Sequence, residues 1–287
     1  MTVAYQGQEG AFSEDVTAAL FPEQTRAARR TFAEVFAALE TSEVEAAVVP
    51  VENTHAGAVA DVYDLLRAHK TVQVVAEAVF RVRHCLLGVK GAQLAGVRVA
   101  RSHPQALAQC EDFLRANNIR PEVAFDTAGA AMEVAAAKDP AVAAIASRRA
   151  AQRYGLAVLA ADIESSAENY TRFFALGRRD DGAVLTRIAT RHLGGPAKTS
   201  LVYTTKNQPG ALTRSLEPFA TAGLQLTKIE SRPSRGAPWE YVFYLDFEGD
   251  PAASPGREAL ALMQVCCEWI QLLGTYPAAT TVLEPEG

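Results

Sequence analysis

The chain has 287 residues, with 33 acidic and 28 basic side chains and a formal net charge of −5. Hydrophobic residues make up 49% and charged residues 21%, which excludes an intrinsically disordered chain and suffices for about two domains. The acidic balance gives no electrostatic reason to expect a nucleic-acid partner. No stretch approaches the ~20 apolar residues of a membrane helix, and no signal-peptide pattern opens the chain. We therefore expect a cytoplasmic protein that binds neither nucleic acid nor membrane.

The sequence lacks the usual signatures of metal and nucleotide sites. Its four cysteines, among them the adjacent Cys266 and Cys267, form no C-x-x-C pair, and its five histidines lack the H-x-x-x-H spacing. Glycine-rich phosphate loops and the G-x-S-x-G motif are absent as well. We expect no metal site and cysteines that serve as small buried hydrophobic residues.

Up to residue 177, short apolar runs alternate with amphipathic stretches, which is typical of an α/β fold. The apolar runs predict strands at Thr2–Tyr5, Glu45–Val51, Val72–Val79, Val97–Ala100, Glu122–Phe125, Val142–Ala146 and Thr171–Leu176. Helical spacing predicts helices at Glu14–Leu20, Phe32–Leu39, Val59–Leu66, Leu107–Leu114 and Ala128–Ala137.

The composition changes at Gly177–Lys198, where clustered charges and Gly194-Gly195-Pro196 indicate a connector. Beyond it the pattern predicts, in order, a strand, a helix, two strands, a helix and a strand: Thr199–Thr205, Pro209–Ala222, Gln225–Ser231, Tyr241–Phe247, Pro255–Leu273 and Ala278–Leu283. The βαββαβ order is that of a small ferredoxin-like domain. The expected division is a large domain over 1–177, a linker over 178–197 and a small domain over 198–284.

Five predicted strands each end in small polar residues that precede a helix: Gly7–Ser13, Glu52–Thr54, Ser102–Gln105, Asp126–Gly129 and Ser147. In open α/β sheets, ligands bind at the carboxyl ends of strands, where the N–H groups and dipoles of helix N-termini hold anions. Ordinary helix capping explains any single cluster. The five together predict a cleft for a small anionic ligand.

A further polar segment, Asn169–Phe174, opens an apolar strand with a Thr–Arg pair. By itself this pair fits an ordinary edge strand with a solvated arginine.

Seven segments, in order from residue 3 to residue 233, resemble motifs of the prephenate dehydratase family. Val3–Ser13 resembles the opening G-P-x-G-[TA]-F-S, Val48–Thr54 resembles VPIENS, Ser102–Leu107 matches SHPQAL, Asp126–Ala131 is similar to STAGAA, and Asn169–Phe173 matches N-x-TRF. Pro209–Leu212 and Ile229–Pro233 resemble the GAL and ESRP motifs of the family's phenylalanine-binding ACT domain. Thr54 replaces the usual serine, and Ala56 and Ala58 replace a glutamate and a serine, so neither alanine receives a role.

The resemblance implies a catalytic domain of two α/β lobes, like the type 2 periplasmic binding proteins, with a ligand site between the lobes and an ACT domain after them. The chain would cross to the second lobe near Val79 and return near Ile163, which makes the first lobe discontinuous. No helical segment precedes Thr2, so we expect an enzyme without a fused chorismate mutase.

The activity that the resemblance implies is the decarboxylating dehydration of prephenate to phenylpyruvate, in the biosynthesis of L-phenylalanine. It implies no cofactor, allosteric inhibition by L-phenylalanine, and a homodimer or homotetramer. Two alternatives stay open at this point. Arogenate dehydratase acts on the amino-acid analogue of prephenate, and no residue decides between the two substrates. A non-enzymatic amino-acid sensor has the same two domains, although Thr171 and Arg172 stand in the family's catalytic motif.

The same motifs imply the site residues. Thr171 would donate a hydrogen bond to the departing hydroxyl, Arg172 would pair with a substrate carboxylate, and Phe173 would exclude water. Glu52 would act either as an acid or as an orienting residue. The substrate would be bound by Asn53, Thr54, Ser102, Gln105, Thr127 and Ser13, together with N–H groups near Gly10. The phenylalanine site would comprise Gly210, Ala211, Leu212, Glu230 and Ser231.

Overall fold

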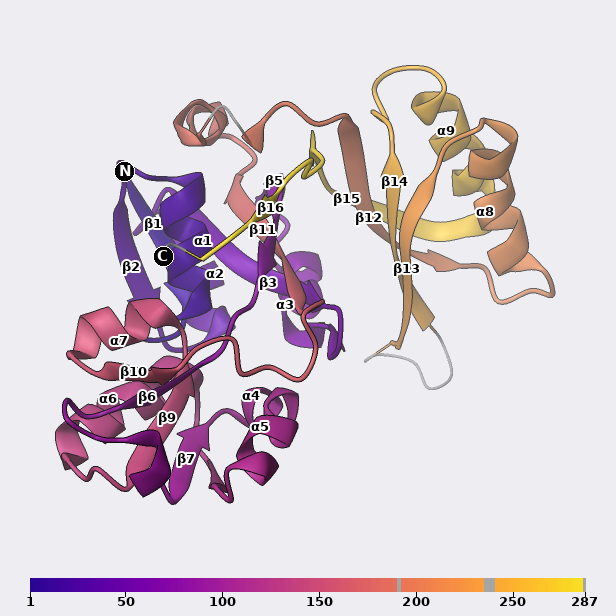
Figure 1. Ribbon diagram of the computed structural model, residues 1–287. Coiled ribbons are helices and arrows are strands. Elements are labelled where there is room, and N and C mark those ends of the chain that lie inside the picture. The colour runs from indigo at the N-terminus through magenta and orange to yellow at the C-terminus, as the bar shows by residue number, and fades with distance from the viewer. Residues whose placement is uncertain (190–191, 235–240, 286–287) are drawn as a thin grey trace.

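A computed structural model of the chain describes residues 1–189, 192–234 and 241–285, so small parts of the predicted linker and of the predicted C-terminal domain lie outside the described residues. The described elements form three sheets (Figure 1). The mixed α/β fold with two lobes confirms the predicted fold class.

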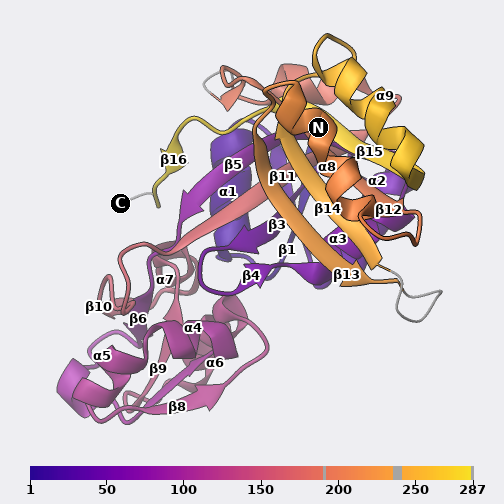
Figure 2. The same cartoon turned by 90° about the vertical axis from the view of Figure 1, so that its right-hand side faces the viewer.

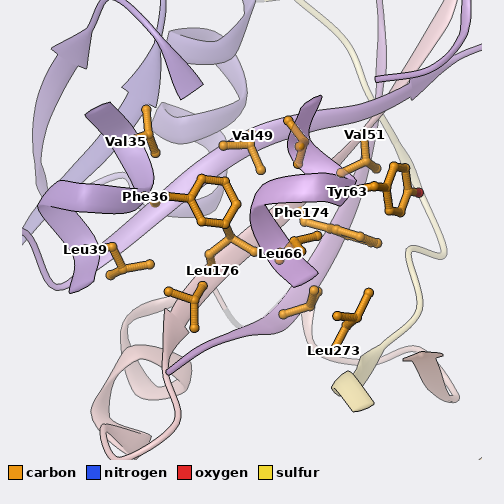
Figure 3. Packing of buried hydrophobic residues seen from close by; sticks show 14 of the residues in the cluster. Val35, Phe36, Leu39, Val49, Val51, Tyr63, Leu66, Phe174, Leu176 and Leu273 are labelled. Carbon is orange, nitrogen blue, oxygen red and sulfur yellow. The ribbon is translucent and has the colours of Figure 1, made fainter. Parts of the chain in front are cut away.

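The first lobe is built from both ends of the chain. Its strands follow the order β16-β5-β11-β3-β1-β2, with β4 pairing β3: β1 (Thr2–Gln6), β2 (Thr25–Arg29), β3 (Ala46–Asn53), β4 (Gly57–Ala58), β5 (Val72–Arg81), β11 (Tyr170–Arg178) and β16 (Val282–Leu283). Helix α1 (Phe12–Leu20) and the 3₁₀ helix η2 (Gly182–Arg187) pack on one face of this sheet, while α2 (Phe32–Glu40) and α3 (Ala60–Ala68) pack on the other. Figure 3 shows the hydrophobic core between the sheet and helices α2 and α3, in which Phe36 and Leu66 pack with Phe174 and Leu176.

The second lobe has the strand order β10-β6-β9-β7-β8. Its elements are β6 (Cys85–Gly88), η1 (Leu94–Gly96), β7 (Val99–Ser102), α4 (Pro104–Gln109), α5 (Glu111–Ala116), β8 (Arg120–Val123), α6 (Thr127–Ala137), β9 (Val142–Ala146), α7 (Arg148–Tyr154) and β10 (Ala157–Ala160). Because β5 continues to Arg81, the chain leaves the first lobe slightly later than expected, at residues 82–84, and it returns through residues 161–169.

Four strands of the two lobes escaped prediction, among them the two-residue β4. β2 carries alanines as its only apolar residues and is half-exposed, so it lacks the alternation of large apolar side chains that marks a strand. β6 and β10 have only four residues each. The predicted helix Leu107–Leu114 is in fact two helices, which meet at Cys110.

The C-terminal domain has the predicted βαββαβ order, as β12 (Ala197–Thr205), α8 (Ala211–Thr221), β13 (Leu226–Pro233), β14 (Tyr241–Glu248), α9 (Gly256–Cys266) and β15 (Cys267–Pro277). The bounds of the last two elements were predicted wrongly. The helix expected over Pro255–Leu273 ends at Cys266, and the last strand of this sheet is β15 rather than Ala278–Leu283. The apolar residues in Cys267–Leu273 are compatible with both the helical and the strand spacing. Pairing with β12, from Thr205↔Cys267 to Ala197↔Pro277, makes this segment a strand.

The C-terminal sheet packs against the α2–α3 face of the first lobe (Figure 2). Val202, Tyr244 and Leu273 share one buried core with residues of that lobe. The approach is close at Gly274, where an added Cβ would lie 2.2 Å from the carbonyl oxygen of Val74. After β15 the chain runs back to the first lobe and adds β16 beside β5.

Candidate active site

A hollow of about 870 Å³, termed the cleft below, is lined by residues of both lobes. This volume suits a small organic ligand. Six of the predicted site residues line the cleft: Ser13, Asn53, Gln105, Thr127, Thr171 and Phe173. Residues from four of the five predicted polar clusters therefore meet in the cleft. This is the arrangement expected of residues at the carboxyl ends of strands in an open α/β sheet.

Residues at the N-terminal ends of five helices, α1, α2, α3, α4 and α6, line the cleft. Side chains cap three of these helices, α2, α4 and α6. His103 Nδ1 accepts a hydrogen bond from the Gln105 N–H at 3.2 Å, and Asp126 Oδ1 accepts one from the Gly129 N–H at 2.5 Å. Because helix N-termini carry partial positive charge, this wall of the cleft favours a ligand carboxylate.

Asn53 and Thr171 form the polar centre of the cleft. They are register partners on β3 and β11, and each is less than a tenth exposed. Asn53 Oδ1 accepts hydrogen bonds from the backbone N–H groups of His55 and Ala56, both at 3.0 Å. Asn53 Nδ2 is therefore a donor, and it lies 3.0 Å from Thr171 Oγ. The threonine oxygen accepts this bond, so its own hydrogen is available to a ligand.

Other residues of the cleft were not predicted. His84, Gln109 and Arg30 line it, and Asn169 bonds to Asn53 behind Thr171. Gln109 lies one helical turn after Gln105, a spacing that places both on one face of α4. Arg30 follows β2, and because that strand was not predicted, its junction with α2 was not recognised as a sixth polar cluster.

His84 packs under an aromatic wall. Its ring meets that of Phe12 edge-on with centroids 5.4 Å apart, and Phe12 in turn contacts Phe80. Burial disfavours the imidazolium form and lowers the pKa of His84, although Gln109 and Glu164 oppose the shift.

Arg172 and Glu52 do not reach the cleft, which contradicts their predicted contact with substrate. Side chains alternate along a strand, so Thr171 and Phe173 face the cleft while Arg172 faces the C-terminal domain. A bulge in β3 determines the place of Glu52. On β11, Arg172 is paired with Glu52, but the next residue, Phe173, is paired with Pro50, so Val51 is the extra residue of the bulge. Because of this shift, Asn53 rather than Glu52 faces the cleft.

Arg172 is the centre of a buried ion-pair cluster between the domains. Its guanidinium contacts Asp246 Oδ2 at 2.6 Å and Glu77 Oε2 at 2.8 Å, and it donates to the Tyr276 hydroxyl at 3.1 Å. Lys198 Nζ lies 3.2 Å from Glu77. Burial acts to lower the pKa of Arg172, but the carboxylate of Asp246 prevails and raises it. Glu52 pairs with Lys228 of the C-terminal sheet at 3.1 Å.

Three other predicted groups are occupied elsewhere. Ser102 is fully buried and donates to the Ile145 carbonyl at 2.6 Å. Thr54 donates to the Glu168 carbonyl at 3.0 Å. The Gly10 N–H donates to Glu14 Oε2 at 2.7 Å. Each is bonded within the protein and none borders the cleft.

The predicted phenylalanine-site residues divide between two elements of the C-terminal domain. Gly210 precedes α8 with a φ of 76°, while Ala211 and Leu212 form its first turn. Glu230 and Ser231 lie on β13, one of the two edge strands of the sheet, where Glu230 is 3.7 Å from Lys228. Beside them, Ile229 exposes 49% of its surface.

These features define a two-lobed α/β protein with a polar cleft between the lobes and a ferredoxin-like C-terminal domain. Residues 3–181 match the family model described as prephenate dehydratase, and the chain belongs to this family. No helix in the described part of the chain is long and apolar enough to cross a membrane.

The sequences of several relatives match nearly the whole chain. It is 38% identical over 290 residues to arogenate dehydratase/prephenate dehydratase 2, chloroplastic, of Arabidopsis thaliana, covering 98% of the chain and 74% of the relative. It is 36% identical over 282 residues to the bifunctional chorismate mutase/prephenate dehydratase of Neisseria gonorrhoeae, covering 97% and 75%.

Two solved structures are also similar. The prephenate dehydratase of Arthrobacter aurescens in complex with L-Phe superposes with a TM-score of 0.83 at 29% identity, covering 96% of this chain and 90% of that one. GqqA, described as a novel type of quorum quenching acylase, superposes with a TM-score of 0.87 at 35% identity, covering 98% and 99%.

Proposed function

We propose that the protein is a carbon–oxygen lyase that converts prephenate to phenylpyruvate, carbon dioxide and water. The observation that carries this proposal is the Thr171 hydroxyl in the cleft, whose oxygen accepts from Asn53 and whose hydrogen is left for a ligand. Family membership supports the same reaction.

In the proposed step, the bond between the ring and its carboxylate breaks, and its electron pair enters the ring as the ring C–O bond breaks. The departing oxygen takes one proton and leaves as water. Thr171 would donate a hydrogen bond to this oxygen as negative charge develops on it. The bond from Asn53 polarises the threonine hydroxyl and strengthens it as a donor. The net proton is drawn from the buffered solvent, and Thr171 keeps its own because an alcohol is no stronger an acid than water.

The walls of the cleft suit the two carboxylates differently. The N-termini of α1, α4 and α6 would hold the carboxylate that is retained. The carboxylate that leaves as carbon dioxide loses its charge, so apolar surroundings such as Phe12 and Phe173 favour the product side of that step. No metal or cofactor takes part in this proposal, because the breaking bond between the ring and its carboxylate supplies the electron pair.

The substrate can be tested directly. The purified chain is incubated with prephenate and, in parallel, with arogenate, and phenylpyruvate and phenylalanine are quantified by chromatography. Faster formation of phenylpyruvate supports the proposal. Faster formation of phenylalanine assigns the chain to arogenate, as the names of several relatives suggest.

An acylase is a second candidate, because GqqA covers the whole fold at 35% identity. Amide hydrolysis by a nucleophilic hydroxyl needs an adjacent base. The two histidines of the cleft instead bond to the Gln105 N–H and to Gln109 Oε1. An N-acyl amide as a third assay substrate separates the two candidates, and cleavage in the absence of prephenate turnover would favour the acylase.

For the C-terminal domain, over 198–284, we propose an ACT domain that binds L-phenylalanine and inhibits the catalytic domain over 1–177. The βαββαβ order, the left-handed Gly210 at the start of α8 and the L-Phe complex of the Arthrobacter aurescens relative support this. The outer strand β13 and its exposed Ile229 offer a surface for a second copy, in line with the expected homodimer or homotetramer. A location in the cytoplasm stays a prediction, since relatives include chloroplastic enzymes.

A further inference from the structure

A continuous line of side-chain hydrogen bonds leads from Thr171 to a histidine outside the catalytic motif. Thr171 Oγ accepts from Asn53 Nδ2 at 3.0 Å, and the same Nδ2 donates to Asn169 Oδ1 at 2.9 Å. Asn169 Nδ2 donates to Gln109 Oε1 at 3.0 Å, and this oxygen lies 2.8 Å from His84 Nε2.

The line joins the parts of the molecule that hold the cleft together. Asn53 ends β3 in the first lobe, and Gln109 ends α4 in the second lobe. His84 and Asn169 lie in the two segments that cross between the lobes. The polar line therefore depends on the relative placement of both lobes.

The direction of every bond in this line is fixed from one end. The N–H groups of His55 and Ala56 can only donate, so the Asn53 atom that they contact is the oxygen. Its amide nitrogen then faces three acceptors, Asn169 Oδ1 at 2.9 Å and the Tyr170 carbonyl and Thr171 Oγ1 both at 3.0 Å, and its two hydrogens are shared among them. The Asn169 atom that Asn53 Nδ2 contacts is therefore the oxygen, and the Asn169 nitrogen donates to Gln109. Gln109 presents an oxygen to His84, so Nε2 of the imidazole carries the hydrogen and Nδ1 carries none.

Burial prevents this order from being reversed. His84 and Asn169 are 2% and 1% exposed, Asn53 is 8% exposed and Gln109 is partly buried, so each amide depends mainly on its protein partners. Turning any one of the amides would place donor against donor or oxygen against oxygen. The Asn53 amide is thus held with its nitrogen toward Thr171.

We propose that Gln109 and His84 are positioning residues for Thr171. They hold the Asn169 and Asn53 amides in the single orientation that makes the threonine oxygen an acceptor and leaves its hydrogen to the departing hydroxyl. This inference rests on the proposed function. It adds that the second lobe orients the Thr171 hydroxyl, the proposed hydrogen-bond donor. This orientation acts through residues that need not touch the reacting atoms.

The first test compares two variants at one position. Gln109→Glu keeps an oxygen that accepts from both Asn169 and His84, whereas Gln109→Met keeps the length of the side chain and removes the acceptor. We expect Gln109→Met to lower kcat about 10-fold with KM changed less than 3-fold, and Gln109→Glu to restore most of kcat. Gln152→Met, an exposed substitution on α7, serves as the matched control and should leave both constants unchanged.

A double-mutant cycle distinguishes positioning from a merely structural role. In a Thr171→Ala background there is no hydroxyl to position, so Gln109→Met should lower the remaining kcat less than 2-fold. An additional 10-fold loss in that background, or a Gln109→Met enzyme with normal kcat, would overturn the proposal.

A measurement on the protein without substrate keeps this inference separate from the proposed function. Nitrogen-15 NMR of the five histidines, with His84 assigned by its absence in His84→Gln, should show His84 as the neutral form with hydrogen on Nε2. Hydrogen on Nδ1 would contradict the proposed direction of the hydrogen bonds, whether or not the protein turns over prephenate. The expected NMR result with no turnover of prephenate or arogenate would instead refute the proposed function.

Discussion

Thr171 and Arg172 are consecutive residues of β11 whose side chains occupy opposite faces of the same sheet. Thr171 lines the cleft, while Arg172 pairs with Glu77 and with Asp246 of the C-terminal domain. A change in how the C-terminal domain is seated therefore acts on the residue next to the proposed hydrogen-bond donor. This adjacency gives regulation from the C-terminal domain a short physical route to the chemistry.

Arg172→Met should destabilise the protein without a comparable effect on substrate binding. It leaves the buried carboxylates of Glu77 and Asp246 without their main cation, a change that typically costs about 3–5 kcal/mol. Denaturant unfolding measures this loss, and KM should change only a few-fold because Arg172 does not line the cleft. Arg115→Met, which removes an exposed pair with Asp112, should cost less than about 1 kcal/mol. A large rise in KM at unchanged stability would return Arg172 to the substrate site.

His84 should make the protein less stable in mild acid. Burial lowers its pKa in the folded state below the ordinary value of 6.5, so the unfolded chain takes up the proton first as the pH falls. The effect is absent well above that value and grows below it. Between about pH 7.5 and about pH 5.5, the free energy of unfolding of the wild type should fall more than that of His84→Gln. Equal losses in both proteins would show that His84 titrates normally.

Gly10 should prove necessary for the contact between the lobes. Its φ is +91°, and an added Cβ would lie 2.9 Å from Cα of Ala150 on the second lobe. The Ser147 hydroxyl donates to the Gly10 carbonyl at 2.6 Å, so the same clash would break this bond. We expect Gly10→Ala to raise KM about 10-fold, a loss of about 1.4 kcal/mol in binding.

Gly91→Ala is the matched control for Gly10→Ala. It has a similar φ of +89° but nothing within 4 Å of the added Cβ, so it carries the backbone strain without the clash. An equal rise in KM for both variants would attribute the effect to strain alone.

Gly210→Val should abolish inhibition by phenylalanine and leave uninhibited turnover nearly unchanged. Gly210 adopts a left-handed φ of 76° at the start of α8, where a branched side chain is strained and covers the backbone N–H groups. Gly223, just beyond the other end of α8, has a φ of +67°, so Gly223→Val carries the same kind of strain away from the proposed site. Dose–response curves with phenylalanine should lose their response only in Gly210→Val. Competitive inhibition that persists in Gly210→Val would place phenylalanine in the cleft.

The motifs and periodicities predicted the elements that build the cleft, because strand ends, caps and helix starts are local features. They did not predict which face of β3 Glu52 occupies, since the bulge at Val51 arises from pairing with β11. Arg172 was misplaced for a related reason. Its partners Glu77 and Asp246 are distant in sequence, and only the packing of the two sheets brings them together. Residues 267–273 of β15 were mistaken for helix because the partner strand β12, rather than their own pattern, determines their conformation.

The most direct test of the account is the turnover of Thr171 variants with prephenate. The oxygen of Thr171 accepts from Asn53, and its hydrogen is assigned to the departing hydroxyl. Thr171→Ala should lower kcat by ~10²-fold or more with KM within a few-fold, because a donor to the leaving group acts mainly in the transition state. Thr171→Ser, which keeps the hydroxyl, should retain clearly more activity than Thr171→Ala. A Thr171→Ala enzyme with near-normal kcat would contradict the central claim.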